Sequence, residues 1–463
     1  MRLTVCHSSS LGGSLSKPVG SGSGARYNRG MGVRLMWMVL SVTLVGLVCR
    51  APVADAAVPS LGADFQFGVA QAGFQSEGYS RDSNWVRYGD QGKVEQKVGN
   101  SVDFYHRYAQ DIARAKSLGV EIYRTSVEWA RVQPSPGRYD DAGWAFYDRV
   151  IRAIVDAGMR PMITLNHWVH PGWEVDRGGW NRSGMADDLV AFGERVVDRY
   201  EWADPLWITF NEPTEYVRRE LMYGGTRPEN AGRMVDGIID AHRRLYRHIH
   251  RVQPRAEVST NLAYFPVPGL GSWLEGLFPE RLRDSMDFVG VDNYYSISVT
   301  DVSTANAITG ELWKATQAPE SIYYVLRHLA KRYPGKPIRI IEAGMAGAPN
   351  GIRPDGYQRG DHLRDTIYWV QRAKQDGIKV VSFNYWSITD NYEWGDYRPR
   401  FGLYSVDVQG DPALTRRPTD AVAAYRQITK ARGVALGYRP TRSPVPCSLV
   451  AIPDSCTHPA VVR

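Results

Sequence analysis

Short apolar runs alternate with longer amphipathic segments along most of this chain, from about residue 65 onward. Eight of the runs fit buried strands, because they are short and rich in Val, Ile, Phe and Tyr. They cover residues 65–70, 121–126, 160–167, 205–212, 257–262, 287–295, 337–344 and 380–387. Between them apolar residues recur at helical spacing, most clearly in residues 103–119, 146–158, 236–252 and 361–377.

This alternation of strands and helices predicts an α/β fold with a parallel sheet and helices outside it. Eight strands separated by roughly 35–45 residues fit a single (β/α)8 TIM barrel, and a doubly wound open sheet is the alternative. A barrel also requires functional side chains at the C-terminal ends of its strands. The sequence meets this requirement with Arg124, His167, Trp168, Asn211, Glu212, Asn293, Tyr294, Tyr295, Glu342 and Trp386.

Two of these residues are carboxylates that a barrel brings to one cleft. Glu212 ends the fourth run and Glu342 the seventh, and these strands lie across a barrel mouth from each other. Two carboxyls that flank a glycosidic bond are the minimum for its hydrolysis, one protonated and one ionised. Arg124 and a tyrosine of the sixth run could hold Glu342 anionic, which leaves Glu212 as the acid. On spacing alone, a structural ion pair explains either glutamate equally well.

Longer stretches connect these residues to a known family. They are FQFGVAQAGFQSEG (65–78), residues 105–134, TLNHW (164–168), GGW (178–180), TFNEP (209–213) and residues 385–407. In this order they resemble glycoside hydrolase family 1, the β-glucosidases and their relatives, from about Phe65 to Ile428. The segment 385–407 is the most specific, because packing alone does not require its fixed order of aromatic and charged residues.

The resemblance implies a retaining exo-β-glycosidase that hydrolyses terminal, unphosphorylated β-glycosides by double displacement, without a cofactor. Glu212 matches the family's general acid/base, Glu342 its nucleophile and Arg124 the arginine beside the nucleophile. The residues that match sugar-binding positions are Gln75, His167, Trp168, Asn211, Tyr295, Trp386, Glu393 and Trp394. Because a carboxylate at Glu393 would repel a phosphate, the substrate is expected to be unphosphorylated.

The chain departs from the family pattern around the nucleophile. Ala343 follows Glu342 where the family usually has Asn, but strand alternation turns this residue away from the cleft. The sixth run reads GVDNYYS (290–296), one residue longer than usual, and of Tyr294 and Tyr295 we expect Tyr295 to meet the nucleophile. Two other functions stay open: an endo-acting barrel glycanase of the same clan, and an inactive carbohydrate-binding protein on this fold.

Charge and the N-terminus bear on location and partners. The net charge is +7, but residues 1–56 hold six basic residues and one acidic residue, which leaves +2 for the rest. No basic stripe stands out there, so we expect no nucleic-acid partner. Arg34, the apolar run 35–48 and the small residues up to Ala56 predict a signal peptide cleaved near Ala56. The protein is therefore expected to be secreted or in the cell envelope, without a membrane partner unless this leader is retained as an anchor.

The predicted mature chain has one domain, residues 57–435, followed by a tail, residues 436–463. Cys447 and Cys456 are its only cysteines, and in an exported protein they are expected to form a disulfide. A metal site is not expected, because the pair His167-x-x-His170 lacks a nearby acidic ligand and no HExxH motif occurs.

Overall fold

The computed structural model describes residues 57–264, 276–296 and 311–463. The predicted leader, residues 1–56, lies outside the described residues. Within them, no helix combines the length and the apolar character needed to cross a membrane.

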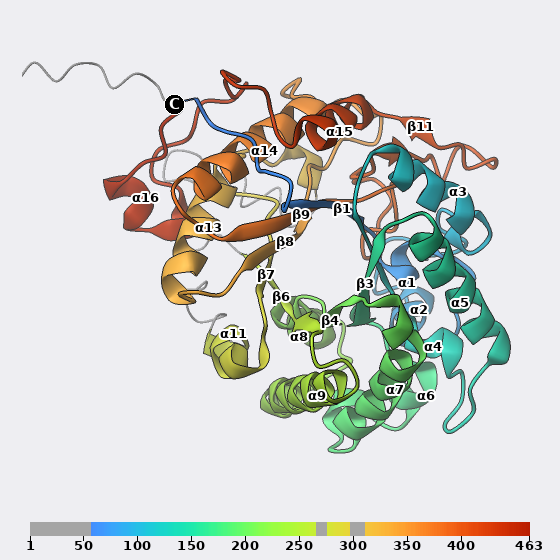
Figure 1. Cartoon of the computed structure of the whole chain (residues 1–463). Helices are drawn as coiled ribbons and strands as arrows, with labels where there is room; N and C mark the ends of the chain where they lie inside the picture. The colour runs from blue at the N-terminus through green and yellow to red at the C-terminus, as the bar shows by residue number, and fades with distance from the viewer. Residues whose placement is uncertain (1–56, 265–275, 297–310) are drawn as a thin grey trace, which may run out of the picture. The chain divides into compact units, whose positions relative to one another are not determined.

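Nine parallel strands form one sheet in the order β5-β4-β3-β2-β1-β9-β8-β7-β6. Their bounds are β1 Gln66–Ala70, β2 Ile122–Ser126, β3 Arg160–Asn166, β4 Leu206–Phe210, β5 Glu257–Ser259, β6 Asn261–Ala263, β7 Val289–Asp292, β8 Ile338–Ala343 and β9 Val380–Trp386. The first strand pairs with both the second and the last, as a barrel requires. Figure 1 shows the strands around a common centre, with the helices outside them.

The fifth predicted strand is split in two at Thr260, and its two halves pair with different neighbouring strands. β5 pairs with β4, and β6 pairs with β7 on the other side. The hydroxyl of Thr260 donates a hydrogen bond of 2.6 Å to the carbonyl of Phe210, which holds the break in place. The prediction of a (β/α)8 barrel is therefore confirmed, and the open sheet is excluded.

The helices follow the strands in sequence and cover the barrel. They are α1 Gly73–Ser76, α2 Asn84–Asp90, α3 Phe104–Ser117, α4 Trp129–Val132, α5 Asp141–Asp156, α6 Gly172–Asp176, α7 Met185–Tyr200, α8 Pro213–Met222, α9 Ala231–Val252, α11 Pro279–Leu282, α13 Ser321–Arg332, α14 Arg359–Gln375, α15 Asp420–Ala431 and α16 Asp454–Thr457. The four predicted helices correspond to α3, α5, α9 and α14. Helix α5 begins earlier than its apolar pattern indicated, because Asp140 caps it and accepts a hydrogen bond from Ala142 N.

The C-terminal residues pack against the barrel's outer helices. Ala460 N donates to the Tyr324 hydroxyl on α13 at 2.6 Å, and Val445 N donates to the buried Glu320 carboxyl at 2.8 Å. Cys447 and Cys456 are joined by a disulfide within this segment. A small antiparallel pair, β10 Tyr404–Ser405 and β11 Arg417–Pro418, precedes α15. Residues 436–463 thus form part of the packed structure.

Candidate active site

The C-terminal ends of the strands surround one pocket with about 880 Å³ of empty space, its open mouth included. The predicted site residues that line it are Gln75, His167, Trp168, Glu212, Tyr295, Glu342, Trp386, Glu393 and Trp394. Arg124 and Asn211 do not line it, because they lie fully buried beneath it. Asp292, Tyr294 and Phe401 also contribute to the lining. The structure therefore brings together residues that are up to about 320 positions apart in sequence.

Glu212 occupies the turn between β4 and α8. Its backbone is left-handed, with φ 36° and ψ 64°, a conformation that costs a non-glycine residue about 1–2 kcal/mol. Pro213 follows as the first residue of α8, where its fixed φ and missing N–H are well tolerated. The hydrogen bond from Asn211 N to Asn166 O, 2.9 Å, ties this turn to the neighbouring strand. Tertiary contacts thus fix the abrupt turn at which the Glu212 carboxyl enters the pocket.

Glu342 lies near the end of β8 and is held by two donors. The buried guanidinium of Arg124 donates to Oε1, and the Tyr294 hydroxyl donates to Oε2 at 2.5 Å. Arg124 is itself fixed by Thr164, at 3.1 Å, and by Asn211, at 2.6 Å. Burial and the charge of Glu342 raise the pKa of Tyr294 well above its usual value, so its hydroxyl keeps the proton that it donates. One cation and one neutral donor therefore face the Glu342 carboxylate.

The expectation that Tyr295 meets Glu342 is wrong, because a register shift changes which residues face the pocket. The pairing of β7 with β8 shifts between Val291 and Asp292. Asp292 and Tyr294 then point toward Glu342, whereas Asn293 accepts a hydrogen bond from Ser321 at the start of α13. Tyr295 lines the pocket, but its hydroxyl has no hydrogen-bond partner within the part of the chain that the structure describes.

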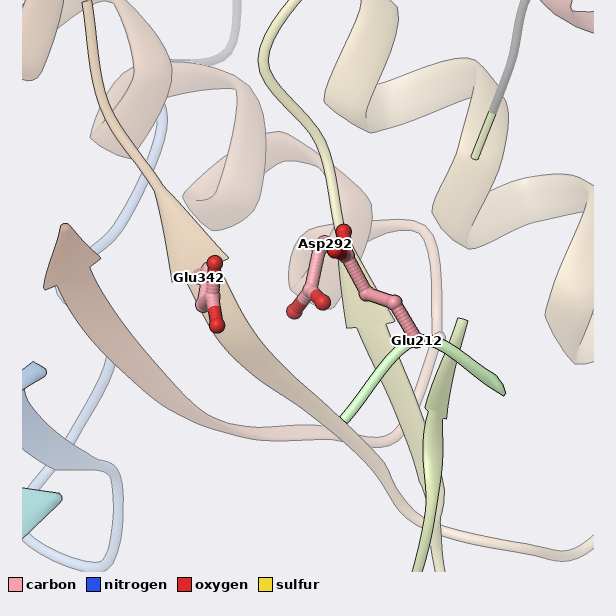
Figure 2. A group of neighbouring side chains, drawn as sticks. All are labelled: Glu212, Asp292 and Glu342. Carbon is pink, nitrogen blue, oxygen red and sulfur yellow. The ribbon is translucent and has the colours of Figure 1, made fainter. Parts of the chain in front are cut away.

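Asp292 is a third carboxyl in the site that the sequence analysis did not identify. One oxygen from each of Glu212, Asp292 and Glu342 lies within 4.8 Å of the other two. Figure 2 shows these three side chains and the strand ends that carry them. The side-chain amide of Asn261 on β6 donates to Asp292 Oδ2. The available signal was the extra residue in the sixth run, since Asp292 is the acidic residue that lengthens this strand end.

The surroundings of the three carboxyls favour protonation of Glu212 and Asp292, the two that Arg124 does not contact. Burial raises the pKa of Glu212 well above its usual value, and the charges of Asp292 and Glu342 raise it further. Burial and Glu342 also raise the pKa of Asp292. Three carboxyls this close resemble the oxygen ligands of a divalent cation. However, Arg124 already supplies a positive charge to Glu342. The arrangement therefore fits an ionised Glu342 beside a pair, Glu212 and Asp292, that holds a proton better than it fits a cation site.

One wall of the pocket combines aromatic rings with polar side chains. The Trp386 indole donates to Glu393 Oε1 at 3.0 Å, and the Gln75 amide donates to Tyr392 O at 2.9 Å. Gln75 Oε1 and His167 Nδ1 are buried without a hydrogen-bond partner among residues 57–264, 276–296 and 311–463. The His167 ring lies 6.0 Å from that of Trp386, centroid to centroid. These groups can accept from and donate to the hydroxyls of a sugar and cover its C–H face.

The electrostatics of this wall are also set by burial. Burial raises the pKa of Glu393 to about 8, although the Trp386 hydrogen bond lowers it. Burial, together with Arg124, lowers the pKa of His167 well below its usual value, so this imidazole is neutral. Ala343 packs in the hydrophobic core and does not line the pocket, in agreement with the expectation that it turns away from the cleft.

Comparisons with known proteins agree with this site. The sequence model of the family described as Glycosyl hydrolase family 1 matches residues 58–267 and 279–434. Beta-glucosidase A of Acetivibrio thermocellus is 27% identical over 444 residues, which cover 80% of this chain and 98% of that protein. Beta-glucosidase A of Thermotoga maritima is 26% identical over 448 residues, with the same coverage of 80% and 98%.

Solved structures show the same fold. The family 1 β-glucosidase of Thermotoga maritima superposes with a TM-score of 0.68 at 25% identity, covering 82% of this chain and all of that one. A β-glycosidase of Pyrococcus horikoshii, at 24% identity, has a TM-score of 0.69 and covers 81% and 96%. A family match over most of the chain, together with paired glutamates at the ends of β4 and β8, leads to one conclusion. The chain belongs to glycosyl hydrolase family 1 and is an O-glycosyl hydrolase.

Proposed function

We propose that the protein is a retaining, exo-acting β-glycosidase that removes terminal, unphosphorylated sugars from β-glycosides. The observation that carries this proposal is the separation of Glu212 and Glu342, whose nearest carboxyl oxygens lie within 4.8 Å of each other. Retaining glycosidases hold their two carboxyls about 5–5.5 Å apart, whereas inverting enzymes leave about 6.5–9.5 Å for a water. The short separation favours direct attack by one of the two carboxylates.

In this mechanism Glu342 is the nucleophile. Arg124 and Tyr294 orient its carboxylate toward the anomeric carbon and compensate its charge. A Glu342 oxygen bonds to that carbon while Glu212 transfers its proton to the departing glycosidic oxygen. Water then attacks the same carbon, the bond to Glu342 breaks, and Glu212 takes the proton of the water. Two inversions return the sugar in its original β configuration.

The proposed sugar subsite lies against the wall that carries Gln75, His167 and Glu393. Their unpartnered or partly satisfied polar atoms are suited to hydroxyl recognition, and the indole of Trp386 is suited to the apolar face of the ring. Asn211 is expected to act at the base of the subsite, beside Glu212, to which its amide donates at 3.4 Å. A phosphate on the sugar would meet the carboxyl of Glu393, which repels it when ionised and offers it no cation when protonated, and this favours an unphosphorylated substrate.

Exo action is supported by the aromatic rings that line the pocket beside the carboxyls. Trp168, Trp386 and Trp394 all line it, and the rings of Trp168 and Trp394 lie 4.4 Å apart, centroid to centroid. The relatives described as β-glucosidases support the same action and a glucoside or a related sugar as the substrate. An endo-acting glycanase of the same clan is the competing function.

The test is a panel of 4-nitrophenyl β-glucoside, β-galactoside, β-fucoside, β-mannoside and β-xyloside, assayed with the wild type, Glu212→Gln and Glu342→Gln. We expect hydrolysis of at least one substrate and its loss on changing Glu342. Proton NMR of the early product should show the β-anomer, and an α-product would overturn the retaining mechanism. Cello-oligosaccharides separate the modes of action, because exo action releases monosaccharide from the start and endo action releases mixed oligomers.

We further propose that the protein is exported, on the basis of the predicted leader. Cell fractionation followed by N-terminal sequencing should recover a chain that begins after about Ala56. Recovery of the intact leader in the membrane fraction would favour the anchor instead.

A further inference from the structure

The position and contacts of Asp292 suit a carboxyl that influences the protonation of Glu212. One carboxyl oxygen of Glu212 lies within 4.8 Å of one carboxyl oxygen of Asp292, a separation at which two ionised carboxylates repel each other. Asp292 Oδ2 accepts from the amide of Asn261. Its other oxygen, Oδ1, is buried and accepts no hydrogen bond from an N–H or hydroxyl group of the described residues. A proton held between the two carboxyls supplies the donor that this contact lacks.

The charged and polar groups around this pair favour one shared proton. They are Arg124 on β2, Asn211 and Glu215 beside Glu212, Asn261 on β6, Tyr294 after β7 and Glu342 on β8. Arg124 is the cation nearest the carboxyl group, and its guanidinium donates to Glu342 and Asn211. Arg218 and Arg219 also line the pocket. Glu215 is paired with arginines on its own helix. Among the described residues, no cation forms an ion pair with Glu212 or Asp292, so carrying two negative charges would be costly for the buried pair.

We propose that Asp292 is a positioning residue that shares the proton of Glu212, so that the two carboxyls act as one acid–base unit. This inference rests on the proposed function and extends it. In the first half-reaction the shared proton moves to the glycosidic oxygen, whose bond to the anomeric carbon breaks as Glu342 bonds to that carbon. In the second, water attacks that carbon, the bond to Glu342 breaks, and the pair takes the proton of the water. Repulsion between the two carboxylates makes them a stronger base for this step.

The unit predicts a pH dependence that a purely structural Asp292 would not produce. In Asp292→Asn, Glu212 loses a negative neighbour and gains an amide that can donate to its ionised form. We therefore expect the alkaline limb of the kcat/KM profile to move down by about one pH unit or more. Above that limb, kcat/KM should fall about tenfold relative to wild type, because one pH unit is a tenfold change in the protonated fraction.

The matched control is Glu220→Gln on α8. Glu220 is also a buried carboxyl, with a pKa raised to about 7 by burial, but it binds Asn84 and Tyr88 and does not line the pocket. This variant should leave the alkaline limb in place. The proposal would be overturned if the alkaline limb of the kcat/KM profile stayed at the same pH in Asp292→Asn, or if it moved equally far in Glu220→Gln.

A second measurement is independent of turnover. Isotope-edited infrared spectra of protein labelled with ¹³C-glutamate follow the Glu212 carboxyl during a pH titration, and Glu212→Gln assigns its band. Glu212 should lose its proton at least about one pH unit lower in Asp292→Asn than in wild type. An unchanged titration would refute the shared proton, whereas inactivity of the wild type on every glycoside would refute the proposed function alone.

Should Asp292→Asn fail to fold, Asn261→Ser provides the test. Serine keeps a polar group but withdraws the amide that donates to Asp292, so the pair should bind its proton more tightly. The infrared titration of Glu212 and the alkaline limb should then move to higher pH. A movement to lower pH, or none, would contradict the proposal.

Discussion

Replacing Tyr294 with Phe tests the contact that the sequence pattern assigned to the wrong tyrosine. The change removes the hydroxyl that donates to Glu342 Oε2 at 2.5 Å and keeps the ring, which packs against Phe401 at 5.6 Å between centroids. A hydrogen bond to a charged group contributes about 1.5–3 kcal/mol, so kcat/KM should fall about 10- to 150-fold. The loss should appear mainly in kcat, because the bond orients the attacking carboxylate and does not hold the sugar.

The adjacent Tyr295 is the matched control. Its buried hydroxyl has no hydrogen-bond partner among the described residues, so Tyr295→Phe removes no contact to Glu342 and should leave kcat within about threefold of wild type, whereas loss of a sugar contact would appear in KM. Steady-state kinetics on the best 4-nitrophenyl glycoside of the panel measures both variants, and thermal unfolding shows that each is folded. The reasoning fails if Tyr294→Phe keeps activity within threefold of wild type, or if Tyr295→Phe loses as much as Tyr294→Phe.

Three further predictions concern specificity, pH and the C-terminal segment. A 4-nitrophenyl β-glucoside should be hydrolysed at least about 100-fold faster than its 6-phosphate, because the Glu393 carboxyl repels a phosphate when it is ionised, above about pH 8, and offers it no cation when it is protonated. Glu393→Ala should narrow the ratio of the two rates, most strongly above about pH 8. Comparable rates on both substrates would contradict this role. Burial raises the pKa of Glu220 to about 7 from 4.5, so the folded state binds more protons than the unfolded state between these values. The contribution of Glu220 to stability is full below about pH 4.5 and is lost as the pH rises through about 7. The Tm of the wild type should therefore fall over this range, and the Tm of Glu220→Gln should fall less steeply. A double change of Cys447 and Cys456 to Ser should lower Tm by about 3 °C in calorimetry, because a short disulfide loop contributes about 2–3 kcal/mol to a chain of this size. An unchanged Tm would mean that the segment is held by its packing alone.

Most of the fold follows from local patterns. Each predicted strand was found within a few residues of its expected bounds, since a buried parallel strand is a nearly continuous apolar run. The split of residues 257–262 at Thr260 was not predicted. The break depends on which strand each half pairs with, β4 on one side and β7 on the other, and this pairing exists only after the barrel closes.

The pocket residues were mostly predictable for the same reason. An inward-facing side chain at the C-terminal end of a barrel strand lies at the mouth, so the presence of Glu212, Glu342 and Trp386 there follows from their strand positions. Orientation near the end of β7 was not predictable. A single extra residue reverses which side chains point inward, and local sequence does not indicate where the register shifts.

By itself, the sequence determined the barrel, the family and the two glutamates, because apolar period, strand-end position and motif order are properties of the chain read in one dimension. Tertiary structure alone decided that Tyr294 meets Glu342, that Asp292 joins the two glutamates, and that the segment after residue 435 packs against α13. These outcomes depend on distances between strands that are far apart in sequence. Such distances fix the register, the hydrogen-bond partners and the charges that each carboxyl experiences.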